Sequence, residues 1–311
     1  MGEKPGRPHT SLAGRDSGST GDFGPELPIL RASAHPPSAS PLRLPANDMR
    51  IATWNVNSIR ARLPLVQEWL ELRRPDVVCL QETKVVDEAF PREELEDLGY
   101  QIAVHGQKTY NGVAILSRRG LEDVRTGFGH ERFDQEARVI AATVEDVMVV
   151  CVYVINGQSV GAERYDDKLE WMAALREYVQ TDFPMQEKVV VTGDFNITVD
   201  DRDVYDPERW REKILCSTPE REALASLCEL GLVDALRDHH DDGGIYTWWD
   251  YRTRGFERGN RGLRIDHLLM SPPALAACSG VEVDREARAK PKPSDHAPVV
   301  ATLEDPREDV G

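Results

Sequence analysis

The chain has 311 residues, of which 40% are hydrophobic, and this is enough for one large α/β domain or two small ones. Its formal net charge of −16 argues mildly against a nucleic-acid partner, because phosphate binding favours Lys and Arg, although the local distribution of charge matters more than the total. The five cysteines are odd in number and form no C-x-x-C pair, which argues against structural zinc and a disulfide framework and favours a reducing cytoplasm.

The first 48 residues differ in composition from the rest of the chain. They contain eight Pro, six Gly and six Ser without a periodic apolar pattern, so we expect a disordered leader. Its five basic and five acidic residues cancel, and the negative charge therefore belongs to residues 49–311. The leader fits neither a signal peptide nor a transit peptide, and Met49, directly before the first expected strand, is a candidate for the natural start. Residues 305–311 are expected to be a C-terminal tail, and no segment reaches membrane-spanning length.

The apolar pattern between these ends predicts strands interleaved with single helices. The expected strands are 50–56, 76–80, 102–105 paired with 113–116, 139–144 paired with 148–154, 188–192, 265–270, 281–283 and 299–303. The expected helices have apolar faces in 63–70 and 165–179, and a third begins at Thr218 as its N-cap and stops at Gly231. Tight strand pairs between single helices predict two mixed sheets packed face to face with helices outside.

Four short polar segments lie far apart in the chain, at 54–57, 81–84, 193–196 and 294–296, and all but the last follow a run of β-branched, apolar residues. Carboxylates and carboxamides at strand ends commonly share a site at one rim of a sheet. Three carboxylates, two carboxamides and a histidine brought together make a hard-cation site with a proton-handling group beside it. The pattern therefore predicts a metal-assisted phosphoester hydrolase.

Two of these segments supply candidate metal and water contacts. A Glu82 oxygen with the Asn55 carbonyl suits Mg²⁺, which takes one or two carboxylates and keeps most of its waters; the alternative is a surface carboxylate that caps a helix. Asp194 and Asn196, two apart at a strand end, can activate a water and donate to a phosphoryl oxygen; the alternative is a β-turn rich in Gly, Asp and Asn.

A histidine and a tyrosine complete the candidate chemistry. His296 is suited to proton transfer near neutral pH, and Asp266 is available to orient it, whereas a buried His–Asp pair used only for packing is the alternative. His267 is the other possible imidazole, but its place inside a strand favours a structural role. Tyr153 ends a strand and is either a core residue or a phosphate contact.

A dense basic run is the strongest candidate for a nucleic-acid contact. It stands beside Trp248 and Trp249 and comprises Arg252, Arg254, Arg258, Arg261 and Arg264. The alternative is a solvated surface, which is the commoner fate of any single arginine.

Seven motifs in order give a more specific indication. They lie at 55–61, 80–84, 112–117, 193–196, 249–252, 261–266 and 292–298, and together they resemble the exonuclease III family of apurinic/apyrimidinic (AP) endonucleases within the endonuclease/exonuclease/phosphatase superfamily. The resemblance covers about residues 49–304. The family commonly has Gly where Ser58 stands and Pro where Ile155 and Val199 stand, so the chain departs from its pattern there.

The resemblance implies a four-layered α/β sandwich of the DNase I-like class, with Mg²⁺ or Mn²⁺ as the cofactor. It implies cleavage of DNA 5′ to an abasic site, together with 3′-5′ exonuclease, 3′-phosphodiesterase and 3′-phosphatase activities. The expected partner is double-stranded DNA with abasic sites or blocked 3′ ends, bound by a monomer without a membrane. A general nuclease or phosphatase of the same superfamily without abasic preference, and a catalytically dead DNA-binding module, are the alternatives.

The resemblance also assigns roles to residues of this chain. The implied metal site comprises Asn55, Glu82, Asp194, Asn196, Asp295 and His296. The implied catalytic residues are Tyr153, Asp194, Asn196, Asp266 and His296. The implied DNA contacts are Asn57, Arg60, Lys84, Asn156, Trp248, Arg252, Arg254 and Arg264, with Trp248 closing a pocket for the abasic sugar.

Overall fold

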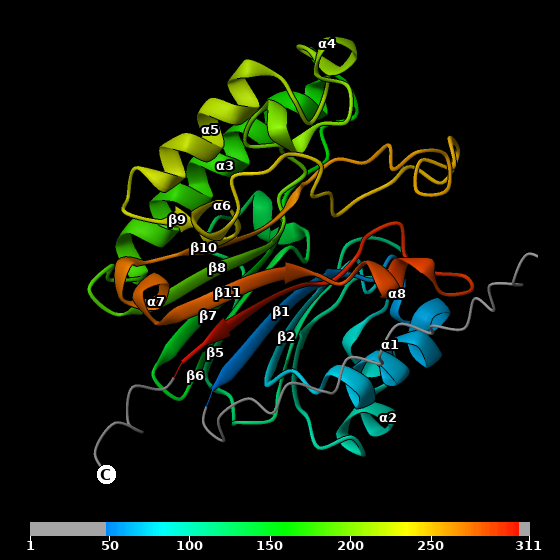
Figure 1. Ribbon diagram of the computed structural model, residues 1–311. Helices are drawn as coiled ribbons and strands as arrows, with labels where there is room; N and C mark the ends of the chain where they lie inside the picture. The colour runs from blue at the N-terminus through cyan, green and yellow to red at the C-terminus, as the bar shows by residue number, and fades with distance from the viewer. Residues whose placement is uncertain (1–47, 305–311) are drawn as a thin grey trace, which may run out of the picture. The chain divides into compact units, whose positions relative to one another are not determined.

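Two six-stranded mixed sheets form the centre of the computed structural model, which describes residues 48–304 (Figure 1). The first sheet has the order β11-β12-β1-β2-β4-β3 and the second β5-β6-β7-β8-β10-β9. The strands are β1 (Met49–Asn55), β2 (Val77–Gln81), β3 (Gln101–His105), β4 (Val113–Ser117), β5 (Glu122–Thr126), β6 (Val139–Val144), β7 (Val147–Tyr153), β8 (Lys188–Asp194), β9 (Val233–Asp234), β10 (Asp266–Met270), β11 (Cys278–Val283) and β12 (Val299–Leu303). The expectations for the leader and the C-terminal tail fall on 1–47 and 305–311, outside the described residues.

Eight helices surround the two sheets within the described residues. They are α1 (Ile59–Arg73), α2 (Arg92–Glu96), α3 (Glu163–Asp182), α4 (Pro207–Trp210), α5 (Thr218–Cys228), α6 (Ala235–His239), α7 (Pro272–Ala277) and α8 (Arg285–Ala289). Of these, α1, α3 and α5 cover the outer faces of the sheets. Helix α1 packs on the first sheet through Val66 and Leu70, while α3 and α5 pack on the second through Leu175 and Leu227 (Figure 1). The molecule therefore has the four layers that were expected.

The layer between the sheets is apolar because both sheets turn every second residue toward it. Ile51 and Ile115 of the first sheet meet Val149 and Leu268 of the second in one buried cluster, whereas Trp54 belongs to the cluster on the outer face. Strands buried on both faces lack polar alternation, which is why their sequences are nearly continuous apolar runs. The expected fold class is confirmed.

Strand direction brings the polar strand ends together. Strands β1 and β2 are parallel, so Asn55 and the residues after Gln81 lie at the same rim. In the second sheet β7 and β8 are parallel and end at Tyr153 and Asp194, and Asp266, which begins the antiparallel β10, lies opposite Asp194. Because β12 runs antiparallel to β1, the segment before Val299 also lies at the rim of Asn55.

Some element boundaries differ from the prediction. Strand β5 was not expected because it is a fully exposed edge strand, Glu-Asp-Val-Arg-Thr, without an apolar pattern. Helix α5 is capped by Ser217 rather than Thr218, because Ser217 and Glu220 form a capping box in which each side chain bonds the main chain of the other. No helix within 48–304 is both long enough and apolar enough to cross a bilayer.

Helix α1 begins at a strained residue. Ser58 has φ 88° and ψ 105°, a conformation that favours glycine, and its hydroxyl oxygen accepts only a long 3.4 Å hydrogen bond from the Ala61 N–H. This is one of the positions where the family commonly has Gly.

We therefore predict that Ser58→Gly raises the free energy of unfolding by about 1 kcal/mol, because relief of the strain outweighs a weak cap. The melting temperature should rise by about 2–4 °C for a domain of this size. Ser226→Gly is the matched control: Ser226 lies inside α5, so the same substitution should lower stability there. A lower melting temperature for Ser58→Gly would contradict the prediction.

Candidate active site

The two sheets meet at their polar rims through one carboxamide. The Asn55 Nδ2 group donates to Glu82 Oε1 at 2.9 Å and to Asp194 Oδ2 at 2.8 Å, so a residue of the first sheet holds one carboxylate from each sheet. The Asn55 Oδ1 atom accepts the main-chain N–H of Asn57 at 2.9 Å, which fixes the orientation of the amide. Glu82 Oε1 also accepts from the Tyr153 hydroxyl at 2.9 Å. Residues from four separate parts of the chain therefore converge.

A buried histidine lies on the other side of Asp194. The His296 Nδ1 atom is 2.9 Å from Asp266 Oδ2 and 3.1 Å from Oδ1, and its Nε2 atom is 3.7 Å from Asp194 Oδ2. The side chains of all three residues are almost fully buried. The pairing of His296 with Asp266 that the sequence suggested is present.

Two asparagines form a neutral hydrogen-bonded pair next to these charges. The Asn156 Nδ2 group donates to Asn196 Oδ1 at 2.9 Å, and Asn196 Nδ2 donates to the Val154 carbonyl at 3.0 Å. Asn196 has φ 53°, and its main-chain N–H donates to Asp194 Oδ1 at 2.9 Å. The turn after β8 thus uses Asp194 to fix the position of Asn196.

Asp295 belongs to a second polar group at the same rim. Its two oxygens accept from Asn57 Nδ2 at 2.9 Å and from the Trp248 indole N–H at 3.1 Å. The Lys84 ammonium bonds Asn57 Oδ1 and forms an ion pair with Glu82 Oε2, both at 2.6 Å. Lys84 therefore links this group to the carboxylates held by Asn55.

Burial separates the protonation states of neighbouring groups. Burial, with a smaller contribution from the Asp266 carboxylate, raises the pKa of Asp194 to about 7. Burial alone would lower the pKa of His296, but the Asp266 and Asp194 carboxylates raise it to about 10, so this imidazole is charged at neutral pH. The site therefore has a carboxyl group that titrates near neutral pH beside a protonated imidazole.

The outer carboxylates behave differently. Burial opposes ionisation of Glu82, but Lys84 and the Asn55 amide hold its pKa below the ordinary value. Burial likewise opposes ionisation of Asp295, whose pKa is nevertheless lowered by His296 and by the hydrogen bonds from Asn57 and Trp248. Burial and the nearby Glu82 charge raise the pKa of Tyr153 well above its ordinary value, so the phenol keeps its proton.

This set of donors fits a metal ion. Asp194, Asp266 and His296 offer ligand atoms that lie within 4.8 Å of one another, so the group can hold a cation. At Glu82 a cation is already accommodated, because the Lys84 ammonium lies 2.6 Å from Oε2. Oxygen donors of this kind suit hard divalent cations.

Only half of the eight residues expected to contact DNA lie around the carboxylates. Asn57, Lys84, Asn156 and Trp248 lie around the carboxylates, as their hydrogen bonds with Asp295, Glu82 and Asn196 show. Arg60 is exposed at the start of α1, and Arg252 and Arg254 are exposed on the turns that follow Trp249. Two arginines of α8 hold these turns: Arg285 lies over the rings of Trp249 and Phe256, and Arg288 over those of Phe256 and Tyr251.

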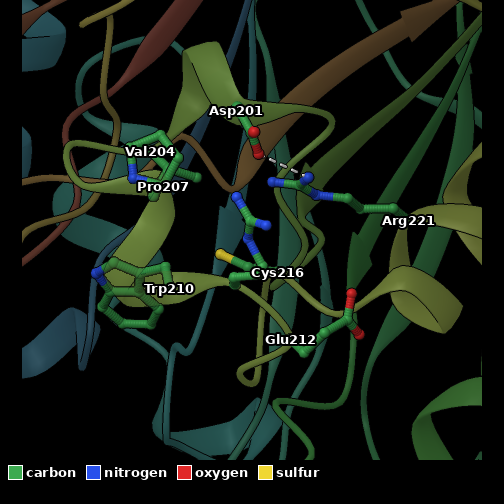
Figure 2. A pocket seen from close by; sticks show the side chains of 8 residues that line it. Asp201, Val204, Pro207, Trp210, Glu212, Cys216 and Arg221 are labelled. Carbon is green, nitrogen blue, oxygen red and sulfur yellow. Dashed lines mark hydrogen bonds and ion pairs between the residues drawn. The ribbon is translucent and has the colours of Figure 1, made fainter.

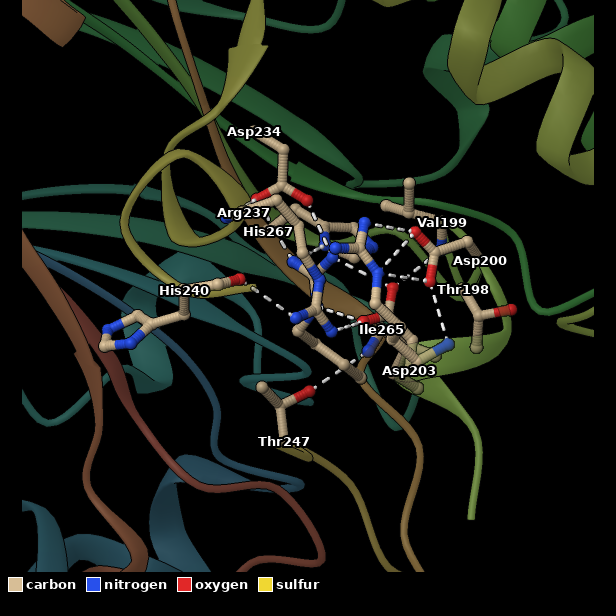
Figure 3. A network of polar contacts seen from close by, with 12 residues as sticks. Thr198, Val199, Asp200, Asp203, Asp234, Arg237, His240, Thr247, Ile265 and His267 are labelled. Carbon is tan, nitrogen blue, oxygen red and sulfur yellow. Dashed lines mark hydrogen bonds and ion pairs between the residues drawn. The ribbon is translucent and has the colours of Figure 1, made fainter. Parts of the chain in front are cut away.

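Arg264 is buried, so its assignment to the exposed basic surface was wrong. Its guanidinium donates from Nε to Asp203 at 2.7 Å and from Nη2 to Asp234 at 2.7 Å. Figure 3 labels these two aspartates within the network. Burial alone would raise the pKa of the Asp203 and Asp234 carboxyls. The Arg264 guanidinium outweighs this effect, so the pKa of each carboxyl is below its ordinary value. A buried charge needs such partners, so Arg264 is structural.

His267 is part of the same network. Its Nε2 atom is 2.7 Å from the Ile197 carbonyl and its Nδ1 atom 2.9 Å from Arg264 Nη1, so Nε2 carries the proton and the ring is neutral (Figure 3). Burial and the Arg264 charge lower the pKa of His267. The structural role that its place in the strand favoured agrees with these contacts.

A cavity of about 230 Å³ lies outside this constellation. Its eight lining residues all fall between 201 and 221, and they include Trp210, Cys216 and Arg221 (Figure 2). Arg221 pairs with Asp201 at 2.9 Å and donates to the Thr198 hydroxyl at 3.2 Å. The predicted carboxylates, asparagines and histidine are elsewhere, so this cavity is not the candidate active site.

Sequence reasoning missed three residues that support the site. Ser294 donates to the Asn55 carbonyl at 2.6 Å, and Arg138 lies 4.7 Å from the Tyr153 ring and donates to its carbonyl. Lys168 is buried and donates to the Asn156 and Asn196 carbonyls. Ser294 lies in the polar segment 294–296 but was given no role of its own, and Lys168 had a signal in the sequence because it occupies the apolar face of the expected helix, three residues after Tyr165.

Comparisons with known proteins agree with this geometry. The model of the endonuclease/exonuclease/phosphatase family matches residues 52–296. Exodeoxyribonuclease III of Haemophilus influenzae is 36% identical over 265 residues, which cover 81% of this chain and 99% of that relative. A Neisseria 3′ phosphatase, NExo, solved with a product DNA hairpin, is 47% identical with a TM-score of 0.80, covering 83% of this chain and 100% of that one. An AP endonuclease from Archaeoglobus fulgidus has the same TM-score and coverage at 38% identity.

The fold, the site and these similarities define a phosphodiester hydrolase built on two packed mixed sheets. The chain belongs to the endonuclease/exonuclease/phosphatase family, and within it to the exonuclease III and AP endonuclease branch. It is a DNA repair nuclease of that branch, and the family is metal-dependent.

The raised pKa of Asp194 leads to a stability prediction. A carboxyl whose folded-state pKa is raised stabilises the fold most at pH values below its unfolded pKa of about 4, and this contribution is lost as pH rises through about 7. Asp194→Asn should therefore raise the melting temperature at pH 8 without metal, by roughly 2–6 °C, and the gain should shrink toward pH 5.

Asp295→Asn is the matched control, because the pKa of Asp295 is lowered and its charge stabilises the fold at pH 8. That variant should melt below the parent protein. If thermal unfolding showed Asp194→Asn to be the less stable protein at pH 8, the electrostatic description of the site would be wrong.

Proposed function

We propose that this nuclease cleaves the DNA backbone on the 5′ side of abasic sites and also trims 3′ ends as an exonuclease, phosphodiesterase and phosphatase. The observation that carries the proposal is the double hydrogen bond from Asn55 to Glu82 and Asp194. Through these bonds Glu82, a carboxylate suited to a cation, and Asp194, a carboxylate suited to a water, both contact the Asn55 amide. A single phosphate can then be reached by both.

The proposed metal is Mg²⁺ or Mn²⁺, held mainly by Glu82 with Asn55 and Asp295 nearby. When bound, the metal supplies positive charge to a phosphoryl oxygen and to the leaving 3′ oxygen. Glu82 is the best candidate ligand because it stays ionised despite burial. Asp194, Asn196 and His296 also belong to the proposed metal surroundings, but His296 is charged and therefore acts better as a hydrogen-bond donor.

In the proposed mechanism Asp194 orients the attacking water and accepts its proton. A general base works best when its pKa is near the working pH, and burial brings Asp194 to that range. The Asn55 amide, which donates to Asp194 Oδ2, leaves Oδ1 free of that contact and fixes the direction of the carboxylate. Attack then occurs from the side of the phosphate that faces β8.

His296 and the asparagine pair are proposed to stabilise the charge that develops on the phosphate, and Tyr153 is proposed to orient Glu82. The charged His296 donates from Nε2 while Asp266 holds Nδ1, and this keeps the ring in one orientation. The Asn156 and Asn196 carboxamides contribute neutral donors, whose preorganised dipoles cost no reorganisation during the reaction. The Tyr153 hydroxyl, protonated and bound to Glu82, orients that carboxylate.

Double-stranded DNA with an abasic site or a blocked 3′ end is the proposed substrate, and we propose that a cytoplasmic monomer acts on it. The five cysteines are all free, as expected in a reducing compartment. Arg252 and Arg254, on turns held by the arginines of α8, are proposed to contact backbone phosphates rather than to read bases. Trp248, fixed by Asp295, is proposed to close the pocket for a flipped abasic sugar.

A second candidate is an enzyme that mainly trims 3′ ends and incises abasic sites poorly. It is favoured by one observation: the Neisseria 3′ phosphatase is 47% identical to this chain, against 38% for the Archaeoglobus AP endonuclease, at the same TM-score. The residues around Glu82, Asp194 and His296 serve either activity. The two candidates differ in the ratio of rates on the two substrates.

The first functional prediction concerns the reaction itself. A labelled duplex with one synthetic abasic site should be cut on its 5′ side with Mg²⁺, and EDTA should abolish cutting. Glu82→Gln and Asp194→Asn should each lower kcat by about 10²–10⁴-fold, because each removes one part of the charge and proton chemistry.

A duplex with a 3′-phosphate, assayed in parallel, gives the ratio that separates the two candidates. An undamaged, blunt duplex is the control. Equal cutting of that control would favour the general nuclease, and no reaction on any of the three substrates would refute the proposal.

The second functional prediction concerns the turns that follow Trp249. Arg252→Gln with Arg254→Gln should weaken duplex binding and make the slope of log K against log[salt] shallower by about 2, because each phosphate contact releases about one counterion. The control pair, Arg74→Gln with Lys188→Gln, removes the same charge near the opposite ends of β2 and β8. An unchanged slope for the first pair, or an equal change for the control, would show that these turns do not bind DNA.

A further inference from the structure

Lys168 is a fully buried cation that bonds the two asparagines proposed to contact the phosphate. It lies on α3, and its side chain has no exposed surface. The ammonium donates to the main-chain carbonyl of Asn196 at 2.7 Å and to that of Asn156 at 3.3 Å, and it also bonds Glu220 Oε1. An ammonium has three N–H groups, so each finds an acceptor.

Two of these acceptors belong to the asparagine pair. Asn156 follows β7 and Asn196 follows β8, and outside their strands the two loops share the side-chain bond between Asn156 Nδ2 and Asn196 Oδ1. The Lys168 ammonium donates to the main-chain carbonyls of the same two residues. The hydrogen bonds of Lys168 and of the asparagine pair therefore form a closed ring. Because of this ring, a shift of the ammonium moves both carboxamides together.

Glu220 anchors the other end of the arrangement. Its Oε1 atom also accepts the Leu215 N–H at 3.1 Å, and its Oε2 atom accepts the Ser217 N–H at 3.1 Å and the Ser217 hydroxyl at 2.7 Å. The carboxylate is thus fixed at the start of α5 by three donors besides Lys168. An ammonium bound to so rigid a partner has little freedom of its own.

The chain around Lys168 is shaped to admit it. Gly157 follows Asn156 with φ 90°, and a Cβ atom there would lie 3.3 Å from Lys168 Cδ and 2.9 Å from Ile214 Cδ1. The glycine lets the loop after β7 lie close to the alkyl chain of the lysine, and this closeness brings the Asn156 carbonyl within reach of the ammonium.

Stability alone does not explain a charge in this place. Burying a lysine and a glutamate costs desolvation, and well-packed apolar residues of the same volume commonly give equal or greater stability. The apolar face of α3 around Lys168 already contains Met172 and Leu175, so an apolar residue would continue it. The ammonium is distinguished by its ability to hold two carbonyls from different loops in one fixed geometry.

We propose that Lys168 is a positioning residue of the nuclease: it fixes the Asn156 and Asn196 carbonyls and thereby aims both carboxamides at the scissile phosphate. This inference rests on the proposed function, in which the asparagines donate to that phosphate. Lys168 itself touches neither DNA nor metal. Its loss should lower kcat and leave DNA binding nearly unchanged, because the exposed arginines are on turns held by Arg285 and Arg288 and not by Lys168.

The test uses three proteins in the full-length chain. Lys168→Met with Glu220→Gln removes the charge pair without leaving an unpaired buried charge, and Lys168→Gln with Glu220→Gln restores an N–H donor on a shorter side chain. The matched control, Arg125→Met with Asp182→Asn, removes an ion pair between β5 and the end of α3. For each protein, kcat and KM are measured on the abasic and 3′-phosphate duplexes, Kd is measured in EDTA, and assays are run at a temperature where the protein is folded.

We expect the methionine variant to lose about 10–100-fold in kcat, the size of effect that a misplacement near 1 Å produces, with KM and Kd within about 3-fold of the parent. The glutamine variant should recover part of the lost kcat, and the control should keep the parent kcat whatever its melting temperature. The order of kcat is thus parent, glutamine variant, methionine variant.

Two results would overturn the inference: a methionine variant whose kcat stays within 2-fold of the parent, or a loss that appears in Kd instead of kcat. If the methionine variant melts below every assay temperature, the glutamine variant decides: a kcat equal to that of the parent, or a weaker Kd in place of a lower kcat, would also count against the role. Failure of the proposed function can be told apart from failure of this inference, because in the first case the parent protein itself would cut neither substrate.

Discussion

The structure depends on a carboxamide that holds two carboxylates from opposite sheets. Glu82 and Asp194 would repel each other at the rim of a buried two-sheet core, and Asn55 donates one N–H to each. This contact decides how the sheets are aligned at that end, because Asn55 and Asp194 are the last residues of their strands. Burial of Asp194 where the sheets meet raises its pKa to about 7, although the hydrogen bond from Asn55 lowers it, so the packing of the two sheets sets the chemistry of the site.

The buried charges around this contact fall into two classes. Arg264 with Asp203 and Asp234, and Lys168 with Glu220, are fully paired and lie behind the site, where they fix loops. Asp194, Asp266 and His296 bring two carboxyl groups to one imidazole, and burial together with these neighbouring charges raises the pKa of Asp194 and of His296, as is common at reactive centres. The overall charge of −16 is compatible with a DNA substrate, because the basic groups that remain exposed beside the site, Arg252 and Arg254, are gathered on turns held by α8.

Much of this arrangement could be predicted from the sequence, and the failures have physical reasons. Apolar runs predicted the central strands, and the polar residues after them predicted the rim, because a carboxylate at the end of a buried strand is costly unless it takes part in a site. Arg264 was assigned to the same surface as Arg252, because a local run of arginines does not reveal that Asp203 and Asp234 lie opposite one of them. The sequence pattern did not predict strand β5, because all its residues are exposed and only its pairing with β6 makes it a strand.

The most direct test of the account is a double-mutant cycle on Glu82 and Asp194, read as the single-turnover rate of cutting at saturating DNA and metal. If both carboxylates act on one phosphate, either single change already disables the reaction, and the combined variant Glu82→Gln with Asp194→Asn should be no slower than the worse single variant by more than about 3-fold. Fully additive losses in log kcat would mean that the two residues act independently, and the single site assembled by Asn55 would be wrong.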